Sequence, residues 1–349
     1  MRITFVLPVF PRGPIGGFRV VYEYANRLTA LGCEVTVVHE RWKGDVREAM
    51  RDLWHGRSQP RLRSALSWFE IDPGVRLVIV PELEPHALPP ADVTFATHWK
   101  TGRLLPHVQS RPFHLVQAYD TWDDIEEVHE VLKLDVPKVA VSTYVAGKLE
   151  DLGNQHVAVV PNGLDHDTFR PPAEDRPRGH SVSLLVSKHP AKGFATGVAA
   201  LSEVRRTIPD LTVNAFGVGP RPDDLPEWMT YHHGLSGEKL VDQVYHRSAV
   251  HLCSSASEGW GFPVAEAMAC GTAVVSTRNG GVEDFCSHNE NALLADSTGL
   301  AEAVTRMLED EALRTRCVQA AYLTASRMDW SASARSLISF IRAFHSTAS

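Results

Sequence analysis

The chain has 349 residues, of which 44% are hydrophobic and 22% charged, and its formal net charge is −7. This composition excludes a disordered or fibrous chain. The net negative charge argues against a general nucleic-acid-binding protein, because such proteins carry an excess of basic residues. A single hydrophobic core seldom grows beyond about 250–300 residues, so the length predicts two domains of roughly 150–180 residues each.

The first half of the sequence alternates short apolar runs with amphipathic stretches. Ile3–Leu7 predicts a strand, Pro8–Gly17 a loop, and Phe18–Leu31 a helix whose apolar residues recur at i+3 and i+4. The other strands expected here are Val35–Val38, Val75–Val80, Val93–Ala96, His114–Val116, Val139–Val141 and Val157–Val160, and the other helices are Ile125–Leu132 and Val145–Leu152. Such alternation predicts a parallel, doubly wound α/β sheet.

Pro161–Gly179 interrupts the alternation with four prolines among charged residues, which is typical of an interdomain linker. The alternation then restarts. Strands are expected at Val182–Val186, Leu211–Phe216, Val250–Cys253 and Ala273–Ser276, and helices at Gly197–Thr207, Lys239–His246, Pro263–Ala269, Leu300–Leu308, Ala312–Ala325 and Trp330–Phe344. We therefore expect two Rossmann-like domains, over residues 1–170 and 171–327.

The five cysteines, Cys33, Cys253, Cys270, Cys286 and Cys317, are odd in number and lie in apolar or alanine-rich surroundings. This pattern favours small buried thiols over a disulfide framework and indicates a reducing compartment, which we expect to be the cytoplasm. The sequence contains no run of about 18 apolar residues, so we expect no membrane-spanning helix. The 17 histidines show no HExxH or paired His/Cys spacing, so we expect no dedicated metal site.

Two charge runs stand out. Arg41–Arg63 holds seven arginines and lysines, and Asp123–Asp135 is acidic. A solvated helix face is the favoured interpretation of both runs. For the basic run, the alternative is contact with an anionic acceptor or with a membrane surface, here the inner face of the membrane.

The segment that carries the most chemistry is Glu258–Glu266, which reads EGWGFPVAE. It follows the predicted strand Val250–Cys253, and Pro263 suits the first turn of a helix. Gly259 and Gly261 let the backbone approach a ligand closely. N–H groups at a helix start can meet an anion, and the two glutamates can hold vicinal hydroxyls of a sugar or a ribose. The alternative is a loop glutamate followed by a solvated helix glutamate.

Four segments share a resemblance. They read PIGGFRVVYEYANRLTALGCEVTVV (Pro14–Val38), ADVTFATHW (Ala91–Trp99), VVPNGLDHDTF (Val159–Phe169) and EGWGFPVAEAMACGTAVVSTRNGG (Glu258–Gly281). They resemble, in order, the glycine loop and first helix, the Asp-x5-His segment, the PNG-x-D-x3-F motif and the C-terminal signature of retaining GT-B glycosyltransferases, the large family 4 (glycosyl transferases group 1). The resemblance covers nearly the whole chain. It implies a GT-B fold, with an N-terminal acceptor-side domain, a C-terminal nucleotide-sugar-binding domain, and a last helix (about 328–349) that packs back on the first domain.

The resemblance also implies roles for the residues that match. In the first domain, Gly16 and Gly17 would bring N–H groups to the donor diphosphate, and His98 would lie near the transferred sugar. In the second domain, Glu258 would hold donor-sugar hydroxyls, and Lys192 would neutralise the leaving diphosphate. The remaining expected contacts to the donor are Gly217 in the base region, the backbone of Gly261, Phe262 and Pro263 beside the sugar, the N–H of Val264 at the phosphates or ribose, and Glu266 at the ribose.

One departure from the family concerns the diphosphate. The family usually places an arginine in a Gly-Arg pair a few residues before the lysine, whereas this chain reads VSKHPAKG with Lys188 as the nearest cation. Lysine is a point charge without the fork of arginine. We expect Lys188 to share the diphosphate role with Lys192.

The resemblance implies a metal-independent hexosyltransferase of glycoconjugate or polysaccharide biosynthesis. It would need no cofactor and would move a hexose or deoxyhexose from a nucleotide-diphosphate sugar to a hydroxyl of a glycan, lipid-linked or small-molecule acceptor. Lysines and helix N–H groups can stabilise the departing diphosphate. Two routes to retention stay open: front-face attack, with the leaving phosphate taking the acceptor's proton, and double displacement, which needs a nucleophile beneath the anomeric carbon. The sequence offers no convincing candidate for that nucleophile. The stretch HLVQAYD resembles branches that build rhamnose-containing polymers, which suggests a deoxyhexose donor.

Three alternatives stay open at this point. Gly13, Gly16 and Gly17 after a strand, with Glu40 ending the next strand, resemble a dinucleotide-binding oxidoreductase, but the loop reads GPIGG and lacks GxGxxG. A GT-B-fold nucleotide-sugar epimerase or phosphorylase would have the same fold, because fold does not decide function. A non-catalytic binding module would not need the full set of charged residues.

Overall fold

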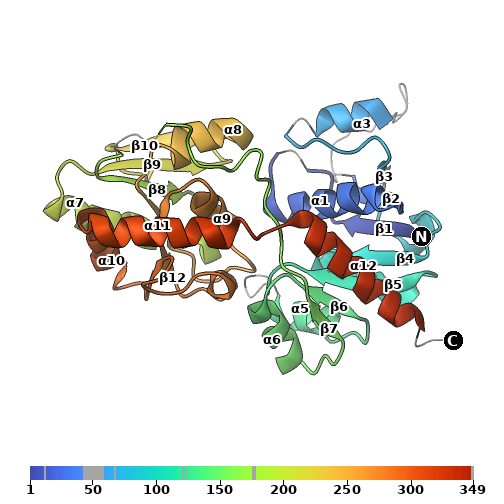
Figure 1. Ribbon diagram of the computed structural model, residues 1–349. Helices are drawn as coiled ribbons and strands as arrows, with labels where there is room; N and C mark the ends of the chain where they lie inside the picture. Colours follow the sequence, from blue (N-terminus) through green and yellow to red (C-terminus); the bar gives the residue numbers. More distant parts are fainter. Residues whose placement is uncertain are drawn as a thin grey trace. The chain divides into compact units, whose positions relative to one another are not determined.

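The computed structural model describes residues 1–11, 13–41, 59–66, 68–119, 122, 124–174 and 178–346. Most of the basic run Arg41–Arg63, and Asp123 of the acidic run, lie outside these residues. The chain forms two compact units (Figure 1). Unit 1 is Met1–Asn162 with Trp330–Ser349, and unit 2 is Gly163–Asp329.

Unit 1 is built on a parallel sheet of seven strands in the order β3-β2-β1-β4-β5-β6-β7. The strands are β1 (Arg2–Leu7), β2 (Glu34–Glu40), β3 (Arg76–Val80), β4 (Val93–Ala96), β5 (Arg111–Val116), β6 (Lys138–Ala140) and β7 (Val157–Val159). The helices are α1 (Gly16–Ala30), α3 (Gln59–Ala65), α4 (Trp99–Gly102), α5 (Ile125–Leu132), α6 (Thr143–Asp151) and α12 (Trp330–Ser346), with 3₁₀-helices at Pro85–Ala87 and Leu105–His107. The central strand β1 pairs with β2 and β4, and its apolar side chains are buried on both faces, as expected of a doubly wound sheet.

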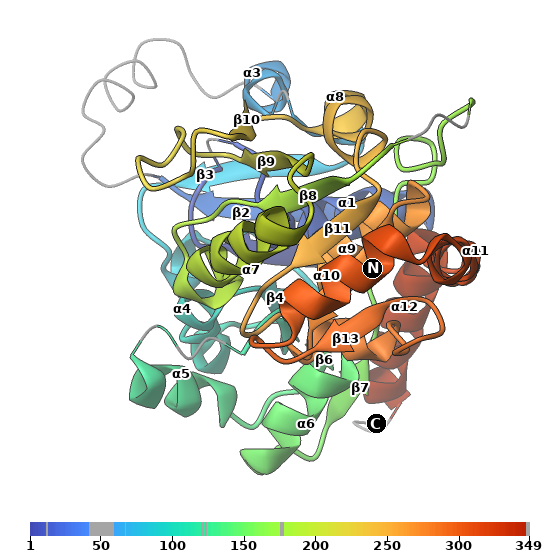
Figure 2. The same ribbon diagram turned by 90° about the vertical axis from the view of Figure 1, so that its left-hand side faces the viewer.

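Unit 2 repeats this plan with six parallel strands in the order β10-β9-β8-β11-β12-β13. The strands are β8 (Ser181–Leu185), β9 (Thr212–Gly217), β10 (Met229–His233), β11 (Val250–Cys253), β12 (Ala273–Thr277) and β13 (Leu293–Ala295). The helices are α7 (Phe194–Thr207), α8 (Gly237–Leu240), α9 (Phe262–Ala269), α10 (Leu300–Glu309) and α11 (Glu311–Ala325), with 3₁₀-helices at Pro190–Lys192 and Gly281–Asp284 and a π-helix at Val241–Tyr245. Figure 2 shows α7 and α10 lying side by side, and the two helices contact each other. The expected α/β architecture of two doubly wound domains is confirmed.

The segment expected to be a linker, Pro161–Gly179, is largely part of unit 2. The N–H of Leu164 donates to the Met328 carbonyl at 3.0 Å, and Leu164 forms a parallel bridge with Asp329. Arg178 donates to the carbonyls of Ser248 and Cys270. These bonds place the division between the units at Asn162 and Gly163, earlier than the residue 170 expected from the proline content.

Helix α12 packs within unit 1, against α1, although its sequence follows unit 2 (Figure 1). Trp330 is buried and meets the ring of Tyr24 edge-on, with 5.5 Å between ring centroids. The Ser333 hydroxyl donates to the Pro161 carbonyl at 2.6 Å, and Arg111 donates to the Phe344 carbonyl at 2.9 Å. Contacts along the whole helix therefore hold the last segment of the chain in the first unit.

Three histidines on central strands, His39, His114 and His251, are almost wholly buried, and burial lowers the pKa of each to about 3. The unfolded chain therefore binds more protons than the folded chain between about pH 6.5 and pH 3, so their stability contribution is complete above pH 6.5 and is lost as the pH falls. We expect each histidine to lower the free energy of unfolding by up to about 1.4 kcal/mol per pH unit below pH 6.5.

Urea unfolding at pH 7, 6, 5 and 4 measures how steeply the free energy of unfolding falls as the pH is lowered. His39→Phe should make this fall less steep, because about one proton fewer is taken up on unfolding. Replacing the exposed His107 by glutamine should leave the pH dependence unchanged. A free energy of unfolding that is constant from pH 7 to pH 4 would contradict the expectation.

Candidate functional site

The segment around Glu258 is held by close backbone contacts between two loops of unit 2. The Glu258 N–H donates to the Asn279 carbonyl at 2.9 Å, and the Gly281 N–H donates to the Glu258 carbonyl at 3.0 Å. A Cβ on Gly281 would lie 2.5 Å from the backbone of Gly259 and Trp260, so only glycine permits this approach. The sequence NGG after β12 thus fixes the backbone from which Glu258 projects.

Glu258 forms an ion pair with Lys192. The ammonium nitrogen Nζ lies 2.8 Å from each carboxylate oxygen, and the Ser255 hydroxyl donates to Oε1 at 2.7 Å. The Glu258 side chain is 7% exposed and that of Lys192 30%. A charge buried this deeply needs a partner and hydrogen bonds, and Lys192 and Ser255 supply both.

The position of Lys192 follows from the turn HPAKG. Lys192 ends the 3₁₀-helix Pro190–Lys192, and Gly193 has φ +58 in the left-handed region. The Ser254 carbonyl occupies the place where a Cβ on Gly193 would stand, and the Ala256 N–H donates to the Ala191 carbonyl at 2.7 Å. The turn is therefore fastened to the loop that carries Glu258.

Helix α9 begins at the second half of the EGWGFPVAE segment. Its N-cap, Gly261, has φ +102, and a Cβ there would lie 2.6 Å from the Val282 side chain. Phe262 and Pro263 form the first turn. The N–H of Val264 donates to the Gly261 carbonyl at 3.1 Å and so closes that turn. The expected contact of the Val264 N–H with the phosphates or the ribose stays a prediction.

Glu266 lies one turn further along α9, and its side chain points into the unit. It is 6% exposed, and its Oε2 accepts a hydrogen bond from the Tyr245 hydroxyl at 2.8 Å. Of the other unit 2 candidates, Gly217 ends β9, where a Cβ would lie 2.5 Å from the Val186 carbonyl, and Lys188 is exposed on the loop after β8.

The candidates of unit 1 lie at the ends of β1 and β4. Gly16 and Gly17 open α1, and the Gly17 carbonyl accepts from Gln117 Nε2 at 3.0 Å. The same amide lies 3.4 Å from the carbonyl of Thr97, the residue before His98. Gln117 thus joins the glycine turn to the His98 segment.

His98 caps α4 with its imidazole. Its Nδ1 accepts a hydrogen bond from the Lys100 N–H at 3.1 Å, and the Thr101 hydroxyl donates to its carbonyl at 2.9 Å. A ring nitrogen that accepts from an N–H carries no proton, so in this hydrogen-bond arrangement the neutral imidazole carries its proton on Nε2. His98 is therefore arranged as a hydrogen-bond donor through Nε2 and not as a base at Nδ1.

The structure thus brings Lys192 and Glu258 into contact, whereas Glu266 contacts Tyr245, which the sequence does not mark as a site residue. Three supporting residues were missed: Ser255, Tyr245 and Gln117. Ser255 lies in the serine-rich loop before Glu258, and Gln117 in HLVQAYD, but neither motif signals a contact. Only the packing of distant segments reveals these partners.

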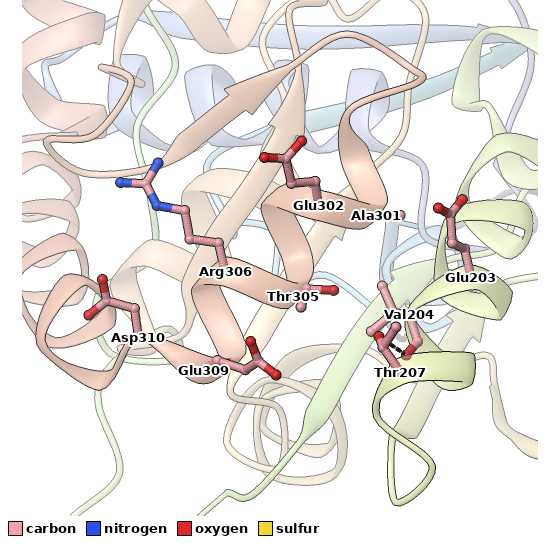
Figure 3. Close-up of a pocket in the computed structure, with 9 residues that line it drawn as sticks. All are labelled: Glu203, Val204, Thr207, Ala301, Glu302, Thr305, Arg306, Glu309 and Asp310. Carbon is pink, nitrogen blue, oxygen red and sulfur yellow. Dashed lines mark hydrogen bonds between the residues drawn. The ribbon is translucent and has the colours of Figure 1, made fainter.

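Unit 2 also has an open groove of about 640 Å³ between α7 and α10 (Figure 3). Its lining residues are Glu203, Val204, Thr207, Ala301, Glu302, Thr305, Arg306, Glu309 and Asp310. None of the residues predicted from sequence lines it. The groove is therefore separate from the candidate site.

The described residues form neither of two other kinds of site. No group of three or more histidine, cysteine, aspartate or glutamate side chains there is arranged to hold a metal ion. In the same ranges, no helix is both long and apolar enough to cross a membrane.

The sequence and the fold of this chain are similar to those of known proteins. Residues 189–324 match the family model "Glycosyl transferases group 1". A glycogen synthase of Mycobacterium tuberculosis is 30% identical over 192 residues, which are 51% of this chain and 46% of that protein. The chain thus spans about half the length of this curated relative.

Two solved structures are similar over nearly their whole length. Sucrose-phosphate synthase from Thermosynechococcus elongatus has a TM-score of 0.78 at 18% identity, and the superposition covers 99% of each of the two chains. Anabaena HepE in complex with UDP-glucose has a TM-score of 0.74 at 14% identity and covers 98% of this chain and 100% of its own. The chain therefore has the GT-B fold, and its residues 189–324 are similar to the glycosyl transferases group 1.

Proposed function

We propose that this protein is a retaining glycosyltransferase of family 4 that uses a nucleotide-diphosphate sugar as donor and needs no metal ion. The observation that carries the proposal is the contact of Lys192 with Glu258, a cation and a carboxylate anchored by glycine turns on adjoining loops. The match of residues 189–324 to the glycosyl transferases group 1 supports it, because this range contains both residues.

In this proposal the ammonium of Lys192 stabilises the negative charge that grows on the departing diphosphate. Without a donor, its nearest anion is Glu258. A lysine ammonium has three N–H donors, so it can bind the diphosphate while it remains beside the carboxylate. Lys188, on the loop before it, adds a second positive charge. The charge of Lys192 is held in place by Glu258 before the reaction, which lowers the barrier without reorganisation.

The remaining residues orient the donor. Glu258 accepts hydrogen bonds from hydroxyls of the transferred sugar, and Glu266 accepts them from the ribose. The backbone of Gly261, Phe262 and Pro263 borders the sugar, and Gly217 the base. In unit 1, His98 donates from Nε2 to the sugar, and Gly16 and Gly17 lie at the diphosphate.

The acceptor attacks the face from which the diphosphate leaves, and a phosphate oxygen takes the proton of its hydroxyl. We propose a hexose or deoxyhexose as the transferred sugar and a glycan, lipid-linked or small-molecule hydroxyl as the acceptor. The protein would act in the cytoplasm. The basic run Arg41–Arg63 is the candidate for contact with an anionic acceptor or with the inner face of the membrane.

The test incubates the chain with UDP-, GDP-, ADP- and dTDP-hexoses and a panel of hydroxyl acceptors, with and without EDTA. We expect nucleotide release that depends on acceptor, a product whose anomeric proton has the donor's configuration by NMR, and the same rate in EDTA. An inverted product or inhibition by EDTA would contradict retention or metal independence. Epimerised donor or phosphorolysis without transfer would support the alternative enzymes of this fold.

A further inference from the structure

Tyr245 is the last residue of the π-helix Val241–Tyr245, and its side chain contacts Glu266. Its hydroxyl donates to Glu266 Oε2 at 2.8 Å, and the two residues are 0% and 6% exposed. A carboxylate buried in a helix costs free energy unless it is hydrogen-bonded. The tyrosine hydroxyl supplies such a bond and, by doing so, fixes the direction of the carboxylate.

Aromatic neighbours hold the ring of Tyr245 in place. The rings of Phe216, His251 and Phe169 meet it edge-on, with centroid distances of 5.8, 5.9 and 6.4 Å. Phe169 is the last residue of the PNG-x-D-x3-F motif and is buried. A ring enclosed in this way cannot swing its hydroxyl away from Glu266.

The backbone of Tyr245 is held by the segment that follows α9. Its carbonyl accepts from the Thr272 hydroxyl at 2.8 Å and from Arg178 Nη1 at 3.4 Å. The Thr272 N–H in turn donates to the Ala267 carbonyl of α9 at 2.9 Å. Thr272 therefore links the backbone of Tyr245 to helix α9, which carries Glu266. π-helical turns are rare and are frequently found at functional sites.

We propose that Tyr245 is a positioning residue that orients Glu266 toward the ribose of the donor nucleotide and so sets the preference for ribonucleotides over deoxyribonucleotides. This inference rests on the proposed ribose contact of Glu266. A carboxylate that cannot rotate presents its oxygens to the vicinal 2′- and 3′-hydroxyls in one fixed geometry, and this preorganisation reduces the entropy lost on binding.

The experiment is isothermal titration calorimetry of the full chain with UDP, GDP and ADP, and then with the 2′,3′-dideoxy form of whichever binds most tightly. Tyr245→Phe keeps the packed ring and removes only the hydroxyl. We expect it to weaken binding of the ribonucleotide by roughly tenfold and to change binding of the dideoxynucleotide by less than about twofold. Glu266→Gln should reduce the same ratio of affinities at least as much.

Tyr24→Phe is the matched control, because Tyr24 is also fully buried and its hydroxyl has no hydrogen-bond partner among the described residues. It should leave both affinities unchanged. Thermal unfolding verifies that each variant is folded.

The outcomes separate the inference from the proposal on which it rests. If Glu266→Gln loses the preference for the ribonucleotide but Tyr245→Phe keeps it, the role of Tyr245 is overturned and that of Glu266 stands. Equal weakening of both nucleotides by Tyr245→Phe would show a merely structural role and also overturn the inference. If no nucleotide binds the wild type, or if Glu266→Gln keeps the preference, the proposed ribose contact itself fails.

Discussion

Replacing Lys192 by alanine is expected to lower kcat for nucleotide release by about 10²–10³-fold, the usual effect of removing one fixed group that stabilises transition-state charge. The reason is that the ammonium, anchored by the HPAKG turn and by Glu258, would face the departing diphosphate. KM for the donor should change less than kcat, because the charge on the diphosphate grows in the transition state.

The measurement is steady-state kinetics with the donor and acceptor identified by the panel, alongside thermal unfolding. Lys239→Ala removes an exposed lysine of α8 and serves as the matched control, with no expected effect on kcat. Lys192→Arg should retain part of the rate, because it keeps the charge but changes its geometry. Unchanged turnover in folded Lys192→Ala would refute the role of this lysine.

Glu258→Gln is expected to remove the contribution of the donor sugar to binding while preserving that of the nucleotide. The amide still fits the space between Ser255 and Lys192 but no longer pairs with the ammonium. The affinity for the nucleoside diphosphate should therefore stay constant or rise, since Lys192 is no longer held by a carboxylate. We expect kcat/KM for the nucleotide sugar to fall by about 10²-fold, because hydrogen bonds to a charged group are lost.

Calorimetric titration with the nucleotide sugar and with the nucleoside diphosphate alone measures the two contributions separately. Glu238→Gln is a suitable control, because Glu238 pairs with Arg170 on the surface of unit 2. If Glu258→Gln weakened both ligands equally, the carboxylate would serve the nucleotide and not the sugar.

Much of the architecture could be predicted because most strands are buried on both faces. Val250–Cys253 (VHLC) and Val93–Ala96 (VTFA) are mostly apolar, and the structure has strands at those same residues. Strand β10 (Met229–His233) was missed because MTYHH lies at the edge of its sheet and has no such run. Proline content likewise predicted a linker at Pro161–Gly179, but proline reports only local backbone preference, whereas the bonds of Leu164 and Arg178 are long-range.

The site was predictable only as far as local motifs extend. Glu258, Gly261 and Glu266 share one segment, and its strand–loop–helix context could be read from the sequence. The partners of those glutamates could not. Lys192 and Tyr245 reach them across the fold, from positions 66 and 21 residues away in the chain. The hydrogen bond of the Val264 N–H also depends on how tightly the first turn of α9 closes, which periodicity does not report.

The most direct test of the central claim is a crystal structure of the chain with a nucleotide-diphosphate sugar that it binds. We expect the diphosphate within hydrogen-bonding distance of Lys192 Nζ, the sugar hydroxyls at Glu258 and the ribose hydroxyls at Glu266. A donor bound elsewhere in unit 2, for example in the groove between α7 and α10, or bound with none of these three contacts, would contradict this claim.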